Sequence, residues 1–283
     1  MALRDTMFGL LVSISVITGI VVYQSREKPV IAAAPFTALR TSTPVPKSQP
    51  AAIVPSQPDS AQLQSVLYEW QSEYPDAEFG VVVRELGGAQ RSASLNADMP
   101  VEASSLYKLY LEDYIYTNIA RGNISLDDSL GGPEDLSDCL NSMIVISDNA
   151  CGQAIGDTIG WTTLNNFVHA AGFNETTETS GNTTTARDMA DFLDQLQGGT
   201  LLRSDFSAQL VDNMEKQIYR QAIPAGDPGV NVADKVGFID ANWNDAAIVY
   251  GPKGTYILVV LSNNAGSAPI ADLSQRVAAF MNQ

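Results

Sequence analysis

The sequence predicts an α/β fold of the α+β type, in which one mixed sheet, built from both ends of a domain, packs against a helical lobe. Two observations lead to this prediction. Strand-like stretches occur at residues 79–95 and again at 232–261, whereas the segment between them is dominated by helical periodicity. With 45% hydrophobic residues, the chain can also bury a full core.

The first elements of the domain are a helix and a hairpin. The helix is predicted by apolar residues at helical spacing, namely Leu63, Val66, Leu67 and Trp70. Residues 79–86 are apolar and β-branched, residues 91–95 alternate, and Gly87-Gly88 between them indicates a turn.

The middle of the domain is helical, and its end returns to strands. Helical patterns cover residues 106–119, 140–146, 150–159 and 164–171. Thr185 and Asp188 form a capping box before a further helix. Short strands follow at residues 232–239, 246–250 and 256–261. A closing helix is indicated by Ile270, Leu273, Val277 and Phe280.

Residues 1–59 are expected to lie outside this domain. An apolar run at residues 7–23 would reach about 26 Å as a helix, so residues 1–28 are predicted to anchor the chain in a membrane. A cleavable signal peptide is the alternative, because Ala32-Ala33-Ala34 resembles its cleavage site. Residues 29–59 are rich in Pro, Ser and Ala and predict a disordered stalk. Residues 60–283 then form one extracytoplasmic domain, either tethered or secreted.

The composition excludes several functions. A net charge of −16 opposes binding to nucleic acids. Two cysteines and one histidine are too few for a zinc hydrolase, and no metal or cofactor is expected. His169 lies in an apolar stretch and is predicted to pack rather than to serve in a Ser-His-Asp triad. We expect a monomer.

Ser105-Leu106-Tyr107-Lys108 has the S-x-x-K pattern of a serine nucleophile with a lysine base. A serine hydroxyl needs a neighbouring base, and Lys108 lies one helical turn along, on the same face. Lys108 can act as a base only if burial and a second cation, for which Lys235 is the candidate, lower its pKa. The pattern alone is weak, because it is expected about once by chance in such a chain, and residues 25–28 match it too.

Ser147-Asp148-Asn149 lies between two predicted helices. Ser147 could relay a proton to a departing nitrogen, and Asn149 could hold a substrate amide and steady Lys108. Asp148 would cap the following helix, and a simple helix cap without a catalytic role is the alternative.

Lys235-Val236-Gly237-Phe238 lies on a predicted strand. Lys235 and Gly237 would then line the substrate site. The backbone N–H groups of Ser105 and Phe238 would form an oxyanion hole.

In this order, the three motifs resemble those of the class A β-lactamase family and its serine transpeptidase relatives. The resemblance covers residues 60–283, including residues 182–190, similar to the family's Thr-rich helix entrance, and residues 222–226, similar to its approach to the catalytic strand. It implies the fold of that family and the following roles: Ser105 as the acylated nucleophile, Lys108 as a base, Ser147 as a proton relay, Asn149 as a substrate contact and Lys235 as the substrate-carboxylate site.

The sequence departs from the family in two ways. The family hydrolyses its acyl-enzyme with water activated by an omega-loop glutamate in a Glu-x-x-Leu-Asn pattern, which this sequence lacks. Glu175 and Glu178 are the candidates for a displaced base, and we interpret both as surface loop carboxylates. Val236 replaces the family's usual Thr or Ser, which would weaken binding of a substrate carboxylate about ten- to a hundredfold.

Cys139 and Cys151 lie on either side of Ser147. In an oxidising compartment they could join the two flanking helices by a disulfide. Two unpaired thiols in the core are the alternative.

The sequence therefore predicts a serine enzyme that is acylated at Ser105 and hydrolyses a β-lactam or a related cyclic amide. A D-Ala-D-Ala peptidase or transpeptidase acting on peptidoglycan peptides is one alternative. A wall-peptide-binding protein without turnover is another.

Overall fold

The computed structural model of this chain describes residues 58–179 and 182–283. The predicted anchor and stalk fall almost wholly on residues 1–57, outside the described residues. Within the described part of the chain, no helix is long and apolar enough to cross a membrane.

A five-stranded sheet forms the centre of the domain, in the order β2-β1-β7-β6-β5. Its strands are β1 (Glu78–Leu86), β2 (Ser92–Leu95), β5 (Asn231–Ile239), β6 (Asn242–Gly251) and β7 (Gly254–Asn263). As expected, the sheet draws on both ends of the domain, because β1 pairs with β7. Every pairing is antiparallel, so the prediction of a mixed sheet is corrected to an antiparallel one.

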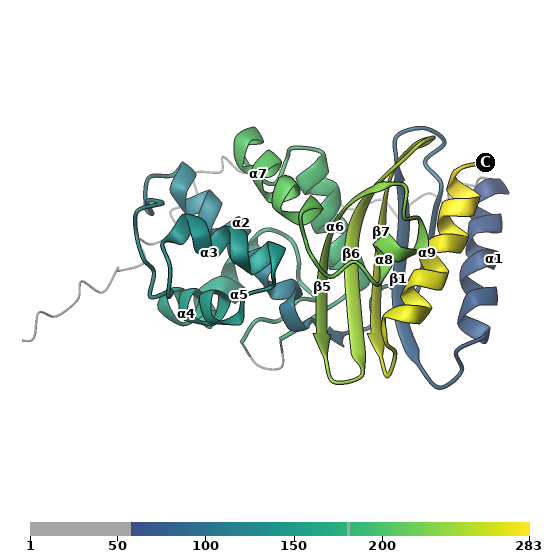
Figure 1. The fold of residues 1–283 in the computed structure, drawn as a ribbon, viewed down its shortest axis with the longest axis horizontal. Coiled ribbons are helices and arrows are strands. Elements are labelled where there is room, and N and C mark those ends of the chain that lie inside the picture. The colour runs from purple at the N-terminus through teal and green to yellow at the C-terminus, as the bar shows by residue number, and fades with distance from the viewer. Residues whose placement is uncertain (1–57, 180–181) are drawn as a thin grey trace, which may run out of the picture. The chain divides into compact units, whose positions relative to one another are not determined.

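Helices cover both faces of this sheet and extend beyond it (Figure 1). The helices are α1 (Pro58–Ser72), α2 (Tyr107–Ala120), α3 (Leu136–Val145), α4 (Asn149–Ile159), α5 (Trp161–Ala170), α6 (Ala186–Gln197), α7 (Ser204–Glu215), α8 (Ile223–Gly226) and α9 (Ser267–Met281). Helices α1 and α9 pack together against one face, around a core that includes Leu67, Trp70 and Leu273. The other face and the helices α2–α6 share a second core. The predicted α+β class, a sheet against a helical lobe, is therefore confirmed.

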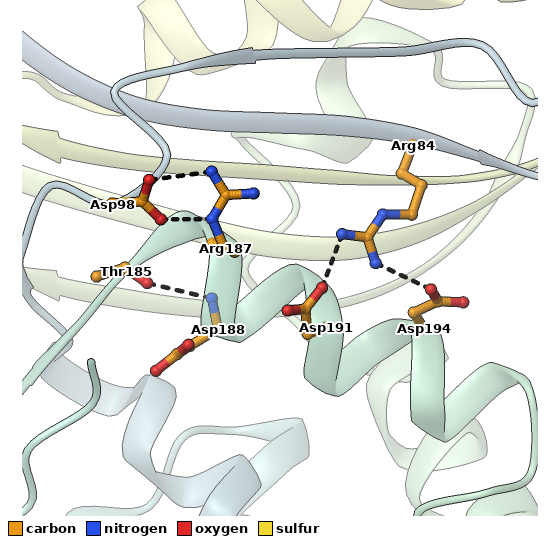
Figure 2. Close-up of polar contacts among 7 residues, drawn as sticks. All are labelled: Arg84, Asp98, Thr185, Arg187, Asp188, Asp191 and Asp194. Carbon is orange, nitrogen blue, oxygen red and sulfur yellow. Dashed lines mark hydrogen bonds and ion pairs between the residues drawn. The ribbon is translucent and has the colours of Figure 1, made fainter. Parts of the chain in front are cut away.

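Helix α6 is fixed to the sheet by charged contacts at its start and along its length (Figure 2). Thr185 caps it as expected, since its hydroxyl accepts a bond from the N–H of Asp188 at 3.1 Å. On β1, Arg84 contacts Asp191 and Asp194 at 2.7 and 2.9 Å. Arg187 pairs with Asp98 in the segment after β2. These contacts hold the helical lobe in a defined position over the sheet.

Four elements were not predicted. Helix α7 and the single-turn helix α8 lie in a stretch where apolar residues do not recur at helical spacing over a long distance. The two-residue strands β3 (Val101–Glu102) and β4 (Thr183–Thr184) pair with each other and are too short to show a pattern. The β3–β4 pairing matters for function, because it joins the segments just before Ser105 and just before α6.

Candidate active site

Ser105 lies in a short 3₁₀ turn, η1 (Ser104–Leu106), which leads directly into α2. Ser104 has a positive φ of 49°, so the chain turns sharply before Ser105. Lys108 sits in the first turn of α2, and its ammonium donates a hydrogen bond to the Ser105 hydroxyl at 3.0 Å. The predicted nucleophile and base are therefore in direct contact.

Lys108 is fully buried and surrounded by oxygen acceptors. Its ammonium reaches the Ser147 carbonyl at 2.8 Å and the Asn149 side-chain oxygen at 2.7 Å. Burial lowers the pKa of Lys108 to about 8, against the opposing charge of Asp148. About a tenth of Lys108 is then neutral at pH 7, and about half at pH 8, and this neutral form can accept a proton.

Ser147 lies in the turn between α3 and α4, with a positive φ of 58°. Asp148 caps α4 as expected, because its carboxylate accepts the N–H of Cys151 at 2.7 Å. Cys151 is joined to Cys139 of α3 by a disulfide, so α3 and α4 are covalently linked on either side of the turn. The turn therefore has little freedom, and it presents Ser147 to Lys108.

Lys235 is fully buried on β5, the edge strand of the sheet. Its ammonium lies 2.9 Å from the Ser147 hydroxyl and 2.8 Å from the carbonyl of Val236. Burial, followed by the charge of Lys108, lowers the pKa of Lys235 to about 7. The start of α2, the turn between α3 and α4, and strand β5 thus bring four side chains into one continuous chain of hydrogen bonds. These are Ser105, Lys108, Ser147 and Lys235.

Gly237 allows β5 to approach the turn that carries Ser105. A Cβ atom at this position would lie 2.4 Å from the carbonyl oxygen of Ala103 and 3.0 Å from the backbone nitrogen of Ser105. The contact places the neighbouring Phe238 at the same end of the strand as Ser105, as the proposed oxyanion hole requires. Val236 is completely buried in the strand.

The interpretation of Glu178 as a surface carboxylate was wrong, because its side chain is only 4% exposed. Neither carboxylate oxygen has a hydrogen-bond partner, and burial raises the pKa of Glu178 to about 8. The loop that carries it is held by the Glu178 N–H on Asn165 at 2.9 Å and by His169 against the Thr176 carbonyl at 2.7 Å. Glu175 is exposed, as expected.

No carboxylate among residues 58–179 and 182–283 hydrogen-bonds to Ser105 or Lys108. Ser105 hydrogen-bonds to Lys108, and Lys108 in turn to the carbonyl and hydroxyl of Ser147 and to the amide oxygen of Asn149.

A buried charge network behind Lys235 was not anticipated. Asp234 accepts a bond from Gln217 at 2.8 Å and pairs with Arg220. Glu112 lies one turn after Lys108 on α2, fully buried and with both oxygens unpartnered. The sequence shows charged residues, Glu112 among them, within the apolar segment 106–119. Their spacing alone could not show that Glu112 lies on the buried face of the helix.

A broad, open hollow of about 640 Å³ lies away from these groups, lined by residues of α1, β2 and the start of α6. Its cation, Arg187, is already paired with Asp98. The hollow does not adjoin the Ser105 chain of hydrogen bonds.

Comparison with known proteins points to one family. The model of the beta-lactamase enzyme family matches residues 60–281 of this chain. None of the curated proteins compared with the sequence matches it.

Solved structures share the fold at low sequence identity. A PBP-A mutant, described as an acyl-enzyme complex with penicillin G, superposes with a TM-score of 0.73 and 24% identity, covering 79% of this chain and 97% of that one. A beta-lactamase from Sphaerobacter thermophilus gives 0.68 and 20%, covering 78% and 97%. A beta-lactamase from Chitinophaga pinensis gives 0.69 and 18%, covering 78% and 98%.

Proposed function

Since the chain belongs to the beta-lactamase enzyme family, we propose that it is a serine acyl-enzyme whose Ser105 opens a β-lactam or a related cyclic amide. One observation carries the proposal. The Ser105 hydroxyl lies 3.0 Å from the ammonium of a buried lysine whose pKa is lowered to about 8. A base of this pKa matches the task of deprotonating a serine near neutral pH.

Acylation follows from the hydrogen-bonded chain. Neutral Lys108 takes the proton of Ser105, and the serine oxygen attacks the amide carbonyl carbon. The N–H groups of Ser105 and Phe238 stabilise the negative oxygen that forms. When the C–N bond breaks, the leaving nitrogen takes a proton from Ser147, which is replenished from Lys108 or Lys235 at 3.4 and 2.9 Å.

Hydrolysis of the acyl-enzyme is proposed to be slow. After the leaving nitrogen is protonated, Lys108 is the base in contact with the ester oxygen. General base catalysis by a well-placed group is typically worth about 10²–10⁴-fold, and Glu178 does not contact Ser105 or Lys108.

A D-Ala-D-Ala peptidase or transpeptidase is the second candidate. It is favoured by the position of Ser105 beside β5, an edge strand along which an extended peptide could pair. A transpeptidase passes its acyl group to an amine, so it has no need of a carboxylate that activates water.

A fluorescent penicillin tests the proposal. We expect a stable adduct on the wild-type protein, detected by gel fluorescence and by the mass of the intact protein, and no adduct on Ser105→Ala. Ser25→Ala is the matched control, because Ser25 heads the second S-x-x-K pattern in the sequence, and it should label normally.

The adduct's fate separates the candidates. Turnover of a chromogenic β-lactam within seconds would indicate an efficient lactamase, and release of D-Ala from a pentapeptide would indicate the peptidase. Failure of every β-lactam to label the wild type, together with no turnover of the chromogenic β-lactam and no release of D-Ala, would reject both acylation mechanisms and favour a binding protein.

We also propose that the domain works outside the cytoplasm. The disulfide between Cys139 and Cys151 supports this, because such bonds persist in oxidising compartments. Alkylation of protein from freshly lysed cells should label neither cysteine before reduction, and labelling of both without reductant would contradict the proposal.

A further inference from the structure

Exposed large apolar side chains gather beside the catalytic groups. Among the described residues, four of the six large apolar side chains with high exposure lie near Ser147 or at the end of β5. These are Ile146, Ile218, Phe238 and Ile239. The other two, Tyr68 and Leu126, lie on α1 and in the segment before α3. A concentration of this kind marks a binding surface rather than random exposure.

Backbone contacts place the aliphatic members together. Ile146 immediately precedes Ser147, and the N–H of Ile218 donates to the carbonyl of Val145 at 3.0 Å. Ile218, at 57% exposure, therefore stands next to the turn that carries the proton relay.

Aromatic rings continue this surface onto the sheet. Phe238 stacks on Trp243 with ring centroids 4.6 Å apart and planes inclined by 13°. Tyr219 meets Phe238 edge-on at 5.3 Å. We call the surface of Ile146, Ile218, Tyr219, Phe238 and Trp243 the apolar rim. It begins at the residue that supplies the proposed oxyanion N–H.

The segment that carries Ile218 and Tyr219 is held to strand β5 by its two flanking residues. Gln217 and Arg220, on either side of it, both bond to Asp234 of β5. Arg220 also donates to the carbonyl of Val232 at 3.0 Å. The charge of Arg220 is therefore already paired with Asp234, and Lys235 is buried. The rim thus has no unpaired exposed cation among these residues to bind an additional anionic group.

We propose that the apolar rim binds a bulky apolar, preferably aromatic, group of the substrate next to the amide that Ser105 attacks. The inference rests on the proposed function and specifies its substrate class. A rigid aromatic wall gains from burying such a group, whereas a carboxylate placed there would lose its hydration without a cation to replace it.

Benzylpenicillin and carbenicillin test the proposal, because they share a nucleus and an aromatic side chain and differ by one carboxylate on that side chain. The wild type should be acylated at least about tenfold faster by benzylpenicillin. Ile218→Ser should reduce this ratio severalfold, and Ile218→Lys should reverse the preference. Leu126→Ser and Leu126→Lys are matched controls at an exposed site elsewhere and should keep the wild-type ratio.

Binding without acylation separates this inference from the proposed function. Calorimetric titration of Ser105→Ala with the two penicillins measures binding without acylation, and should show the same preference. If the wild type is not acylated but Ser105→Ala still prefers benzylpenicillin, the reaction is wrong and the rim assignment stands. Equal binding and equal acylation would overturn it. A shift from dimer to monomer in Ile218→Ser, with the ratio unchanged, would assign the rim to self-association instead.

Discussion

Lys108 and Lys235 direct their ammonium groups at the same hydroxyl, that of Ser147, at 3.4 and 2.9 Å. Burial lowers the pKa of both lysines, to about 8 for Lys108 and about 7 for Lys235, and the nearby charge of Lys108 lowers the pKa of Lys235 further. The pair can hold and pass a proton around Ser147 near neutral pH.

The first prediction concerns the pH dependence of acylation. Lys108 must be neutral to accept the serine proton, so the acylation rate should rise with pH and level off above about 8. Arginine stays charged throughout the range from pH 5 to 10, so Lys108→Arg should slow acylation by about 10²–10⁴-fold at every pH in it. Stopped-flow acylation from pH 5 to 10 measures both, with exposed Lys253→Arg as control. A flat profile would contradict Lys108 as the base.

The second prediction concerns the contact between β5 and the Ser105 turn. Gly237→Ala should slow acylation at least about a hundredfold, because the added methyl would displace the backbone around Ala103 and Ser105. Gly229→Ala adds the same methyl where nothing lies within 4 Å, and should leave the rate unchanged. Circular dichroism would show that both variants are folded. Normal acylation of folded Gly237→Ala would mean that the oxyanion hole does not depend on this approach.

How much of this site the sequence could predict depended on the kind of signal. Ser105 and Lys108 are three residues apart, and helix geometry alone brings them together. Asp148 and Thr185 act as caps because their local patterns are self-contained. The meeting of Ser147 with Lys235 depends on tertiary packing across 88 positions, and the sequence did not predict it.

Two predictions from the sequence were wrong because tertiary contacts decide the outcome. Glu178 looked like a loop residue on the surface, because loops are usually polar and exposed. The contacts from Asn165 and His169 that pull its loop inward come from α5 and carry no sequence signal. The antiparallel pairing of β1 with β7 likewise follows from chain topology, which strand patterns do not encode.

The third prediction concerns Glu178 and deacylation. In the structure, this carboxyl makes no hydrogen bond to Ser105 or Lys108, so we expect Glu178→Gln to change the rate of acyl-enzyme hydrolysis by less than about twofold. Loss of the labelled adduct over time, followed by intact mass, measures this rate. Exposed Glu175→Gln on the same loop is the control. A decrease of about 10²-fold or more would identify Glu178 as the general base for hydrolysis of the acyl-enzyme.

The fourth prediction concerns the disulfide. Replacing Cys139 and Cys151 together by alanine should lower the free energy of unfolding by about 3 kcal/mol, as expected for a short closed loop. Urea denaturation with and without reductant measures the change. Reductant should destabilise the wild type and leave the double variant unaffected, whereas an equal response of the two proteins would show that the bond is not formed.

The fifth prediction concerns Glu112 and stability. Burial without a hydrogen-bond partner raises the pKa of Glu112 well above its ordinary value of 4.5. Above that value the unfolded chain releases this proton while the folded state retains it. Folding therefore becomes less favourable as pH rises, by up to about 1.4 kcal/mol per pH unit, until the folded-state pKa is reached.

Glu112→Gln is neutral at every pH and should escape this loss. We expect the variant and the wild type to have similar unfolding free energies near pH 4.5, with the variant increasingly more stable toward pH 8. Urea denaturation across this range measures the difference, and exposed Glu175→Gln should show none of it. A constant difference between Glu112→Gln and the wild type at all pH values would mean that Glu112 is charged in the folded protein, held by Lys235, whose charge acts on it from β5.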